Sequence, residues 1–588
     1  MQLEKTDLNS LKVNILKYIR FCILFVFFAC INHAYVYPQS LSGSLVSKFI
    51  IFNKGENHSG TINTRLDEIA WKGERIINQL VIWTPESPVS DITYQVTDLI
   101  GVQDTIPASN VTLRSVHYVK ADQFSKGCSE YDKRDFTVFD ELGDVLTETP
   151  ITTLSPDDPV KIWLTIDIPI RINTGDYCGS LSIQARGKTE LVFEIKIRVT
   201  DWTLPAREDW TFHLDLWQYP TRVIDRYNDD HPDQKLKYWS EEHYAMLKQM
   251  YLILADKGQK VITAHIKEGA LGCPSMVQWI KTKDNSWKYD FSIFDQYVDS
   301  LMSWGINKQI SCHSPVGWNS DEIPYFDEIS QENLILEAPV GSSIYQERWN
   351  DFLSKFRHHL IERGLFEKTV LFMDEIGEDK LEMVIGMIKN NDPEWKIGLA
   401  GFHQLPAMID TNIYDLSLHY IIPFESVNQS RNNTFYFSCN PPFPNNFVAS
   451  DAEPAVNAFI GWYAYSQHIN GFLRWAYDDW LDAEPYEMRI GSHTSGDFCL
   501  IYRSSNDMEM KFYSSIRLEL MRDGIQDYEK LIILEDYLKK SSKTSDNQSL
   551  LKLENKLKEF SAMTWGAGDI TLLVESAQEL IKDIIAGK

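Results

Sequence analysis

Two acidic side chains, Asp374 and Glu375, end the apolar segment "TVLFMDE" (369–375). The apolar and β-branched residues before them predict a buried strand. Buried charges are costly and adjacent carboxylates repel each other, so this pattern favours a pocket in which both acids share a task. General acid–base catalysis is the chemistry that such a pair can perform. The alternative is structural, because an Asp at a strand–helix junction often caps the next helix.

Other polar and aromatic side chains fall at the ends of further strand-like segments. Histidines and aromatics dominate there, with few lysines or arginines, which favours a neutral polyhydroxylated substrate over a phosphate. Each of these side chains could instead pack in the core. The set comprises Trp217, His265, His313, Trp318, His403, His419, Tyr436, Trp475, Tyr477, Asp478 and Trp480.

Metal catalysis is a rival interpretation, because several histidines lie at strand ends. Yet no HxH pair occurs on the first of these strands, and no HExxH motif occurs anywhere. The scattered cysteines form no CxxC pair, so a zinc ribbon or a redox motif is not expected. We therefore expect no metal and no cofactor.

The segments that carry these residues alternate with amphipathic helices, and eight such strands across about 270 residues match the size of a (β/α)8 barrel. A barrel would gather the strand ends at one face. A doubly wound open sheet is the alternative, but no GxGxxG motif follows any strand. The expected strands are 210–217, 260–266, 308–314, 369–375, 396–403, 413–420, 434–440 and 471–480.

The rest of the chain predicts an N-terminal β-sandwich and a helical C-terminal tail. Short alternating strands with turn signals fill residues 39–205, and 588 residues are too many for one core. We expect an α/β protein with a signal segment at 1–38, a sandwich at 39–205, a catalytic barrel at 206–535 and a helical extension at 536–588.

The N-terminus predicts export. Lys17 and Arg20 precede an apolar run over 21–31, about half the ~20 residues that span a bilayer, as in a signal peptide. Cleavage after Ala34 implies a periplasmic protein, whereas lipidation of Cys30 would make it a lipoprotein anchored at the cell surface. Cys128 and Cys178 could then form a disulfide or stay as free thiols.

The bulk composition excludes one class of partner. The formal net charge is −26, so the basic footprint of a nucleic-acid binder is missing. Aromatic residues make up 12% of the chain, which suits surfaces that stack against sugar rings, or simply large cores.

Several segments in the same order resemble glycoside hydrolase family 123, the bacterial β-N-acetylgalactosaminidases. The resemblance implies a β-sandwich ahead of a (β/α)8 barrel whose fourth strand carries the catalytic Asp–Glu pair. The matching segments are "WLTIDIPIRINTGDYCGSLSI", "FHLDLWQYP", "WKYDFSIFDQYVDSLMSWGINKQISCHS", "MDE", "KIGLAGFH", "GFLRWAYDDW" and "SSIRLELMRDGIQDYEK".

The resemblance also implies a mechanism. Glu375 would protonate the glycosidic oxygen, and the 2-acetamido oxygen of the substrate would attack the anomeric carbon to give an oxazoline intermediate, with retention. Asp374 would orient the acetamide N–H. Adjacent strand residues point to opposite faces, so the strand must bend or end at Asp374, with help from Gly377.

Further roles are expected around this pair. Asn445, which matches a Pro-Asn position of the family, and Tyr436 would bind the acetamide. Trp475 and Tyr477 would form a wall against the sugar, and His265, His313 and Trp318 would bind hydroxyl groups. Two positions depart from the family: Ile376 replaces an arginine, and His313 lies in a segment that usually contains tyrosine.

The expected protein is an exported β-N-acetylgalactosaminidase-like glycosidase that acts on a glycolipid or glycoprotein glycan. Two alternatives stay open: a barrel that binds glycans without turnover, and a glycosidase for sugars without an N-acetyl group that uses Asp478 as its nucleophile. The preference for GalNAc over GlcNAc and the oligomeric state stay open as well.

Overall fold

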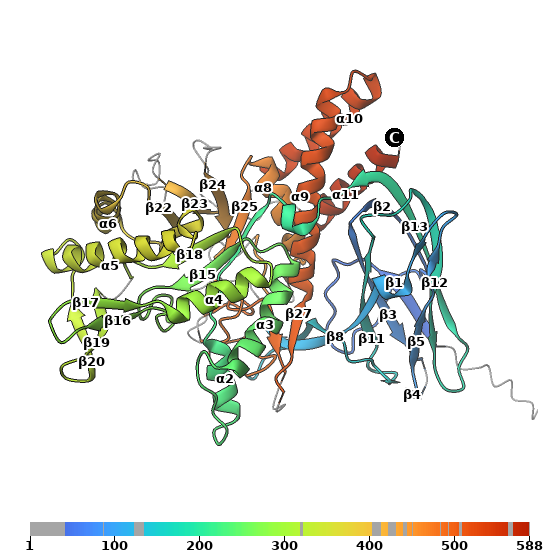
Figure 1. The fold of residues 1–588 in the computed structure, drawn as a ribbon. Coiled ribbons are helices and arrows are strands. Elements are labelled where there is room, and N and C mark those ends of the chain that lie inside the picture. Colours follow the sequence, from blue (N-terminus) through green and yellow to red (C-terminus); the bar gives the residue numbers. More distant parts are fainter. Residues whose placement is uncertain are drawn as a thin grey trace, which may run out of the picture.

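A sheet-rich N-terminal part and a barrel make up most of the molecule, with helices from the C-terminal region between them (Figure 1). The expected signal segment with Cys30, together with Cys128, Trp318 and His403, lies outside the described residues. This computed structural model describes residues 41–588 except 86, 123–133, 318–320, 403–412, 421–430, 439–443, 450, 482–483, 492, 505–508, 563–568 and 587–588.

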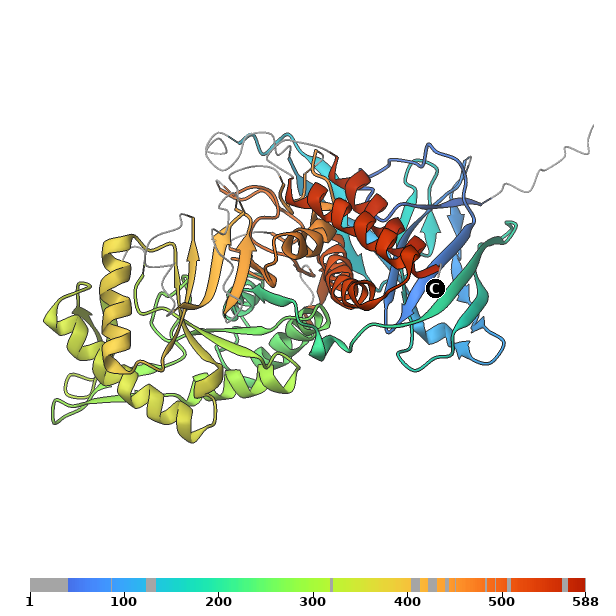
Figure 2. The same ribbon diagram turned by 90° about the horizontal axis from the view of Figure 1, so that it is seen from above.

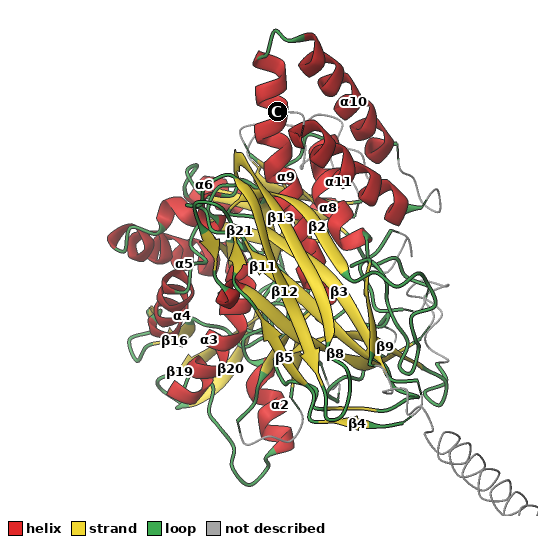
Figure 3. Ribbon diagram, turned by 90° about the vertical axis from the view of Figure 1, so that its right-hand side faces the viewer, coloured by secondary structure: helices red, strands yellow, loops and turns green. Residues whose placement is uncertain are grey.

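Two sheets face each other in the N-terminal part (Figure 3). The sequence of β13 (Leu191–Thr203) explains the arrangement, because Phe193, Ile195, Ile197 and Val199 are buried while residues between them are more exposed. One sheet has the order β1 (Ser42–Val46), β3 (Arg75–Trp83), β11 (Val160–Asp167), β8 (Val111–Ala121), β9 (Asp140–Thr147), β27 (Phe512–Ser515) and β26 (Tyr502–Arg503); the other has β2 (Arg65–Lys72), β13, β12 (Gly175–Gln184), β6 (Leu99–Ile100) and β7 (Thr105–Ile106), with β5 (Thr93–Val96) also on β12.

Eight parallel strands form a nearly closed barrel, and each comes from one of the eight segments expected from the sequence. The two ends of the strand order approach each other, since the Lys260 N–H donates to the Leu214 carbonyl at 3.0 Å. The order is β14 (His213–Leu216), β25 (Gly471–Arg474), β24 (Asn432–Tyr436), β23 (Ile413–His419), β22 (Lys396–Gly401), β21 (Thr369–Asp374), β18 (Gln309–His313) and β15 (Val261–His265).

Helices fill most of the described connections between these strands. The links after β22 and β23 lie largely outside the described residues, so the complete (β/α)8 arrangement stays a prediction. The helices are α2 (Arg222–Asp230) and α3 (Glu241–Asp256) after β14, α4 (Ser292–Ser303) after β15, α5 (Ser343–Glu362) after β18, α6 (Glu378–Asn391) after β21, α8 (Val456–Ser466) after β24, and then α9 (Ile516–Lys540), α10 (Thr544–Ser561) and α11 (Ile570–Ala586).

A small four-stranded sheet stands beside the barrel. It is made by the connection from β15 to α4 and the connection from β18 to α5, and its β19 begins close to the cavity described below. Its order is β17 (Trp287–Asp290), β16 (Gln278–Lys281), β19 (Glu322–Asp327) and β20 (Glu332–Glu337).

Helix α9 joins the two parts of the molecule. Its buried Glu519 accepts from Arg114 of the N-terminal sheet at 2.7 Å and from Lys257 of the barrel at 2.8 Å. Just before this helix, β27 pairs with β9. Strands β26 and β27 thus lie in the predicted barrel segment but hydrogen-bond into the N-terminal sheet, and the domain limits themselves stay predictions.

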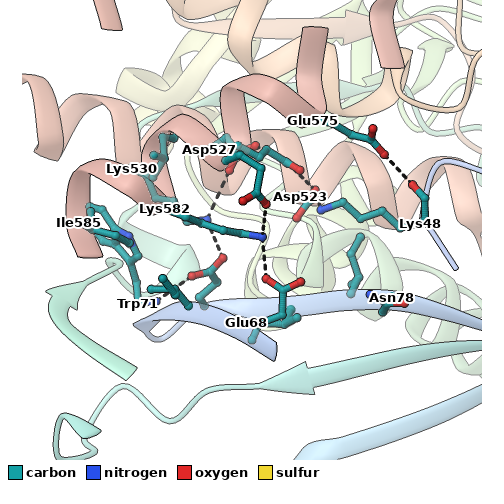
Figure 4. A pocket seen from close by; sticks show the side chains of 18 of the residues that line it. Lys48, Glu68, Trp71, Asn78, Asp523, Asp527, Lys530, Glu575, Lys582 and Ile585 are labelled. Carbon is teal, nitrogen blue, oxygen red and sulfur yellow. Dashed lines mark hydrogen bonds and ion pairs between the residues drawn. The ribbon is translucent and has the colours of Figure 1, made fainter. Parts of the chain in front are cut away.

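The C-terminal helices lie over the junction between the barrel and the sheets (Figure 2). Ion pairs hold α9 and α11 to the N-terminal part, among them Lys530 with Glu74 at 2.6 Å. Lys582 of α11 pairs with Glu68 of β2 at 2.7 Å (Figure 4). No helix among the described residues is long and apolar enough to cross a membrane.

Candidate active site

The acidic pair lies at the C-terminal end of β21. The strand ends at Asp374, and Glu375 adopts a left-handed backbone with φ of 48°. This conformation is uncommon for a residue with a side chain and turns the chain at the strand tip. Gly377, which was expected to help the strand bend or end at Asp374, has an ordinary φ of −63°. The turn is therefore made by Glu375 itself.

The two carboxylates have different surroundings. Asp374 is half-buried and lines a cavity, and burial together with the nearby Glu375 charge raises the pKa of Asp374 well above its usual value. Glu375 is exposed, and its Oε1 accepts a hydrogen bond from the Tyr436 hydroxyl at 2.6 Å. Tyr436 ends β24 and is itself buried. Strand β24, which is separated from β21 by β23 and β22, therefore contributes the partner of Glu375.

The cavity beside Asp374 has a volume of about 610 Å³, within the range of ligand sites. Its floor is apolar, because Trp217 packs with Phe372 and Ala400 in one buried cluster. Its rim is polar and mostly acidic. The lining residues are Trp217, Tyr219, Lys267, Glu268, Gly269, Ala270, Leu271, Gly272, His313, Ser314, Val316, Gly317, Glu322, Pro324, Asp374, Trp475 and Asp479.

Trp475 is held firmly at the wall of this cavity. Its indole N–H donates to Asp497 at 3.1 Å, and the same carboxylate oxygen accepts from the fully buried Arg474 at 2.5 Å. His493 stacks on the indole with ring centroids 5.6 Å apart. A rigid aromatic face of this kind suits the apolar side of a sugar ring.

The remaining predicted site residues are spread around the barrel. His313 lies in the cavity, and His265 is fully buried next to it on β15. Tyr477 is buried away from the cavity, since its hydroxyl donates to the Met250 carbonyl at 2.9 Å. Asn445 is also buried, and its amide donates to the Ser438 carbonyl. Trp318 lies outside the described residues.

Sequence reasoning missed several residues that line the cavity. Tyr219 donates its hydroxyl to the Trp475 carbonyl at 2.9 Å, and Asp479 accepts from Arg222 at 2.6 Å. Tyr219 follows Trp217 closely in "LWQYP", and the glycines of "EGALGCP" (268–274) signal a tight loop. Both patterns can be seen in the sequence. Only the fold shows that the segments "LWQYP" and "EGALGCP" line the same cavity.

The described residues hold no group of three or more His, Cys, Asp or Glu side chains that could bind a metal. A second cavity, of about 360 Å³, lies between the N-terminal sheet and helices α9 and α11 (Figure 4). Its lysines pair with acids of the same cavity, such as Lys48 with Asp523 at 2.6 Å. The cavity at Asp374 is therefore the better candidate for an active site.

Comparison with known proteins identifies the family of the chain. Residues 217–534 match the catalytic domain model of glycoside hydrolase family 123, and residues 46–185 match the N-terminal domain model of that family. No curated protein matches the chain significantly.

Among solved structures, a family 123 glycoside hydrolase from Clostridium perfringens, described in a study of glycolipid glycan hydrolysis, is similar. It superposes with a TM-score of 0.78 at 24% identity, over 93% of this chain and 98% of that one. A family 39 glycoside hydrolase from Bacteroides cellulosilyticus reaches a TM-score of only 0.32 at 10% identity, over 79% of this chain and 82% of the other.

The catalytic-domain match spans the barrel strands that carry the acidic pair and the cavity, and it covers more than half of the chain. The chain therefore belongs to glycoside hydrolase family 123 and is a glycosidase.

Proposed function

We propose that this glycosidase removes terminal β-linked N-acetylgalactosamine with retention of configuration, using the 2-acetamido group of the sugar as the nucleophile. The observation that carries the proposal is that the two acids at the tip of β21 have different surroundings. Asp374 lines the cavity, while Glu375 is exposed beside Tyr436. One acid is thus available to the bound sugar and the other to the leaving group.

In the first step, Glu375 gives its proton to the glycosidic oxygen as the bond from that oxygen to the anomeric carbon breaks. The acetamide oxygen bonds to the same carbon from the opposite face, which yields an oxazoline. Water then attacks, Glu375 takes up its proton, and the oxazoline opens with net retention. Well-oriented intramolecular attack supplies about 7–11 kcal/mol of barrier reduction.

Asp374 accepts the acetamide N–H in this scheme. A carboxylate whose pKa is raised by burial and by Glu375 is a stronger base, so it draws the N–H proton more effectively as positive charge develops. Trp217 and Trp475 then provide apolar surfaces for the sugar ring and the acetamide methyl group.

The alternative nucleophile, Asp478, is poorly placed for chemistry. Its side chain is fully buried, one oxygen accepts the Tyr219 N–H at 2.8 Å, and the other accepts the Tyr251 hydroxyl at 3.2 Å. Burial raises the pKa of Asp478 to about 7. These contacts favour a structural role over attack on a sugar.

The substrate and location follow from the same proposal. Because the similar Clostridium perfringens enzyme is described with glycolipid glycans, we propose a glycolipid or glycoprotein glycan for this chain too. We also propose export to the periplasm or, if Cys30 is lipidated, to the cell surface, and a complete (β/α)8 barrel around the site.

The test offers aryl β-GalNAc, β-GlcNAc and β-Gal substrates, with a thiazoline mimic of the oxazoline as inhibitor. Turnover of acetamido sugars alone, blocked by the thiazoline, supports the proposal. Cleavage of β-Gal that ignores the thiazoline would contradict it, and tight binding without turnover would indicate a glycan-binding protein. Glu375→Gln should lose about 10²–10⁴-fold on poor leaving groups, and Asp374→Asn on every leaving group.

A further inference from the structure

Two buried histidines lie beside the cavity without hydrogen-bond partners. His265 and His313 are each fully buried, and none of their four ring nitrogens has a partner in the described part of the chain. Buried polar groups are nearly always paired, and an unpaired one is costly. The pair therefore calls for a partner that arrives with a ligand or with water.

His313 is the member of the pair that reaches the cavity. Its ring packs against Trp217, with centroids 4.8 Å apart, and against Phe372, at 5.1 Å. It pairs in register with Phe372, two residues before Asp374. The imidazole is thus a polar group set between aromatic rings on the floor where the sugar would lie.

The charge of these rings indicates what they can bind. Burial lowers the pKa of His313 and of His265, the latter to about 3, so both are neutral. A neutral imidazole has one donor and one acceptor nitrogen. A hydroxyl group, which donates and accepts, matches it. An anion does not, because Asp374, Asp479, Glu268 and Glu322 also line the cavity.

We propose that His313 is a specificity-determining residue: its imidazole hydrogen-bonds a free hydroxyl of the terminal hexosamine, so the site selects a neutral sugar and rejects one sulfated at that hydroxyl. This inference rests on the proposed function. His265 is a positioning residue in it. The centroids of the two rings are 6.5 Å apart, and the two residues pair in register on β15 and β18.

The experiment compares wild type, His313→Phe and His313→Gln on aryl β-GalNAc, its 3-, 4- and 6-deoxy analogues, and its 3-, 4- and 6-O-sulfated forms. In wild type, one deoxy analogue should lose about 10- to 100-fold in kcat/KM. His313→Phe should lose a similar factor in kcat/KM on aryl β-GalNAc. On the deoxy analogue that wild type cleaves poorly, the kcat/KM of His313→Phe should equal that of wild type. His313→Gln, which keeps a donor and an acceptor, should recover part of the loss.

His243→Phe is the matched control, because His243 is also fully buried but has both ring nitrogens paired, with Pro220 O at 2.7 Å and Trp239 N at 2.8 Å. It should lower the melting temperature without changing the deoxy pattern, whereas His313→Phe should leave the melting temperature equal or higher. Equal losses on every deoxy analogue in wild type and His313→Phe, or unimpaired turnover of the sugar sulfated at the hydroxyl that the deoxy series identifies, would overturn the inference.

A failure of the His313 inference can be distinguished from a failure of the proposed function. If wild type cleaves no acetamido sugar, the proposed function fails, and the same sugars are then tested for binding by calorimetry. Dependence of binding on one hydroxyl that disappears in His313→Phe would still support the role of His313, and its absence would contradict it.

Discussion

At the scale of single residues, the acidic pair shows how one strand tip gives two carboxylates different environments. Asp374 faces the cavity and holds its proton more tightly than a free aspartate, while Glu375 faces solvent and the Tyr436 hydroxyl. The difference follows from the left-handed backbone at Glu375, which separates the two side chains. Two predictions test the difference.

The first concerns stability. Because the pKa of Asp374 is raised in the folded state, the folded protein binds more protons than the unfolded chain above about pH 4, and Asp374 costs stability as pH rises. Asp374→Asn should therefore raise the melting temperature at pH 8, and the gain should shrink toward pH 4. The exposed Asp233→Asn is the control. An equal gain at both pH values would contradict the raised pKa.

The second concerns Tyr436. Removing its hydroxyl in Tyr436→Phe takes a donor from Glu375 Oε1, and hydrogen bonds to charged groups contribute about 1.5–3 kcal/mol. Steady-state kinetics should show kcat/KM reduced by about 10- to 100-fold with little change in melting temperature. Tyr94→Phe removes a hydroxyl that donates to Ile151 O in the N-terminal part, and it should leave kcat/KM unchanged. Wild-type kinetics for Tyr436→Phe would refute this role.

The sequence predicted only part of this site. The position of Asp374 and Glu375 at a strand end is visible in the pattern "VLFMDE". The apolar run indicates a buried strand, and the two charged residues indicate the point at which the chain reaches solvent or a cavity. The left-handed turn at Glu375 was not visible, since glycine is the usual sign of such a turn and Gly377 misled the expectation. The direction of Tyr477 away from the cavity was equally hidden, because β25 ends at Arg474 and the strand alternation that would place Trp475 and Tyr477 on one face no longer applies after it.

At the scale of elements, the barrel strands were predictable because strand-like segments alternate with amphipathic helical segments along this part of the chain. Strand β21 has all of Thr369–Met373 buried, as expected for a parallel strand covered on both faces. Strands β26 and β27 were not predicted as part of the N-terminal sheet, because β26 pairs with β27 and the other partner of β27, β9, lies far back in the sequence. Local patterns carry no information about such distant pairing.

The crossing of α8 and α9 gives a prediction at this scale. A Cβ at Gly524 would come within 2.2 Å of the Ala458 backbone oxygen, so Gly524→Ala must push the helices apart. We expect a loss of about 1–3 kcal/mol or more, seen in thermal unfolding. Gly386→Ala in α6 is the control, since nothing lies within 4 Å of its Cβ, and it should stabilise by about 0.5–1 kcal/mol. Similar shifts in both variants would contradict the close crossing.

At the scale of the whole molecule, charged residues join the sheets, the barrel and the C-terminal helices. Lys530 of α9 pairs with Glu74 at 2.6 Å and with Asp527 at 3.4 Å, and all three side chains are largely buried. Glu519 forms a similar junction with Arg114 and Lys257. The buried acids at these two junctions therefore each have a cationic partner.

Removing one buried cation should show how much these charged contacts contribute to the stability of the protein. Lys530→Met leaves Glu74 and Asp527 buried without their partner, which should cost about 3–5 kcal/mol. Lys540→Met removes an exposed pair with Asp536 and should cost no more than about 1 kcal/mol. Thermal and urea unfolding measure both. Equal midpoints for the two variants would show that the junction contributes little.

The pairing of β27 with β9 also bears on how the protein is made. Ser514 and Ser515 pair with Leu146 and Val145, so this stretch of β9 stays open at the ribosome until nearly the whole barrel has been translated. An open edge is a template for wrong partners. This edge of β9 therefore stays unpaired for most of the synthesis of the chain. A truncated product that ends before residue 512 would keep the same unpaired edge.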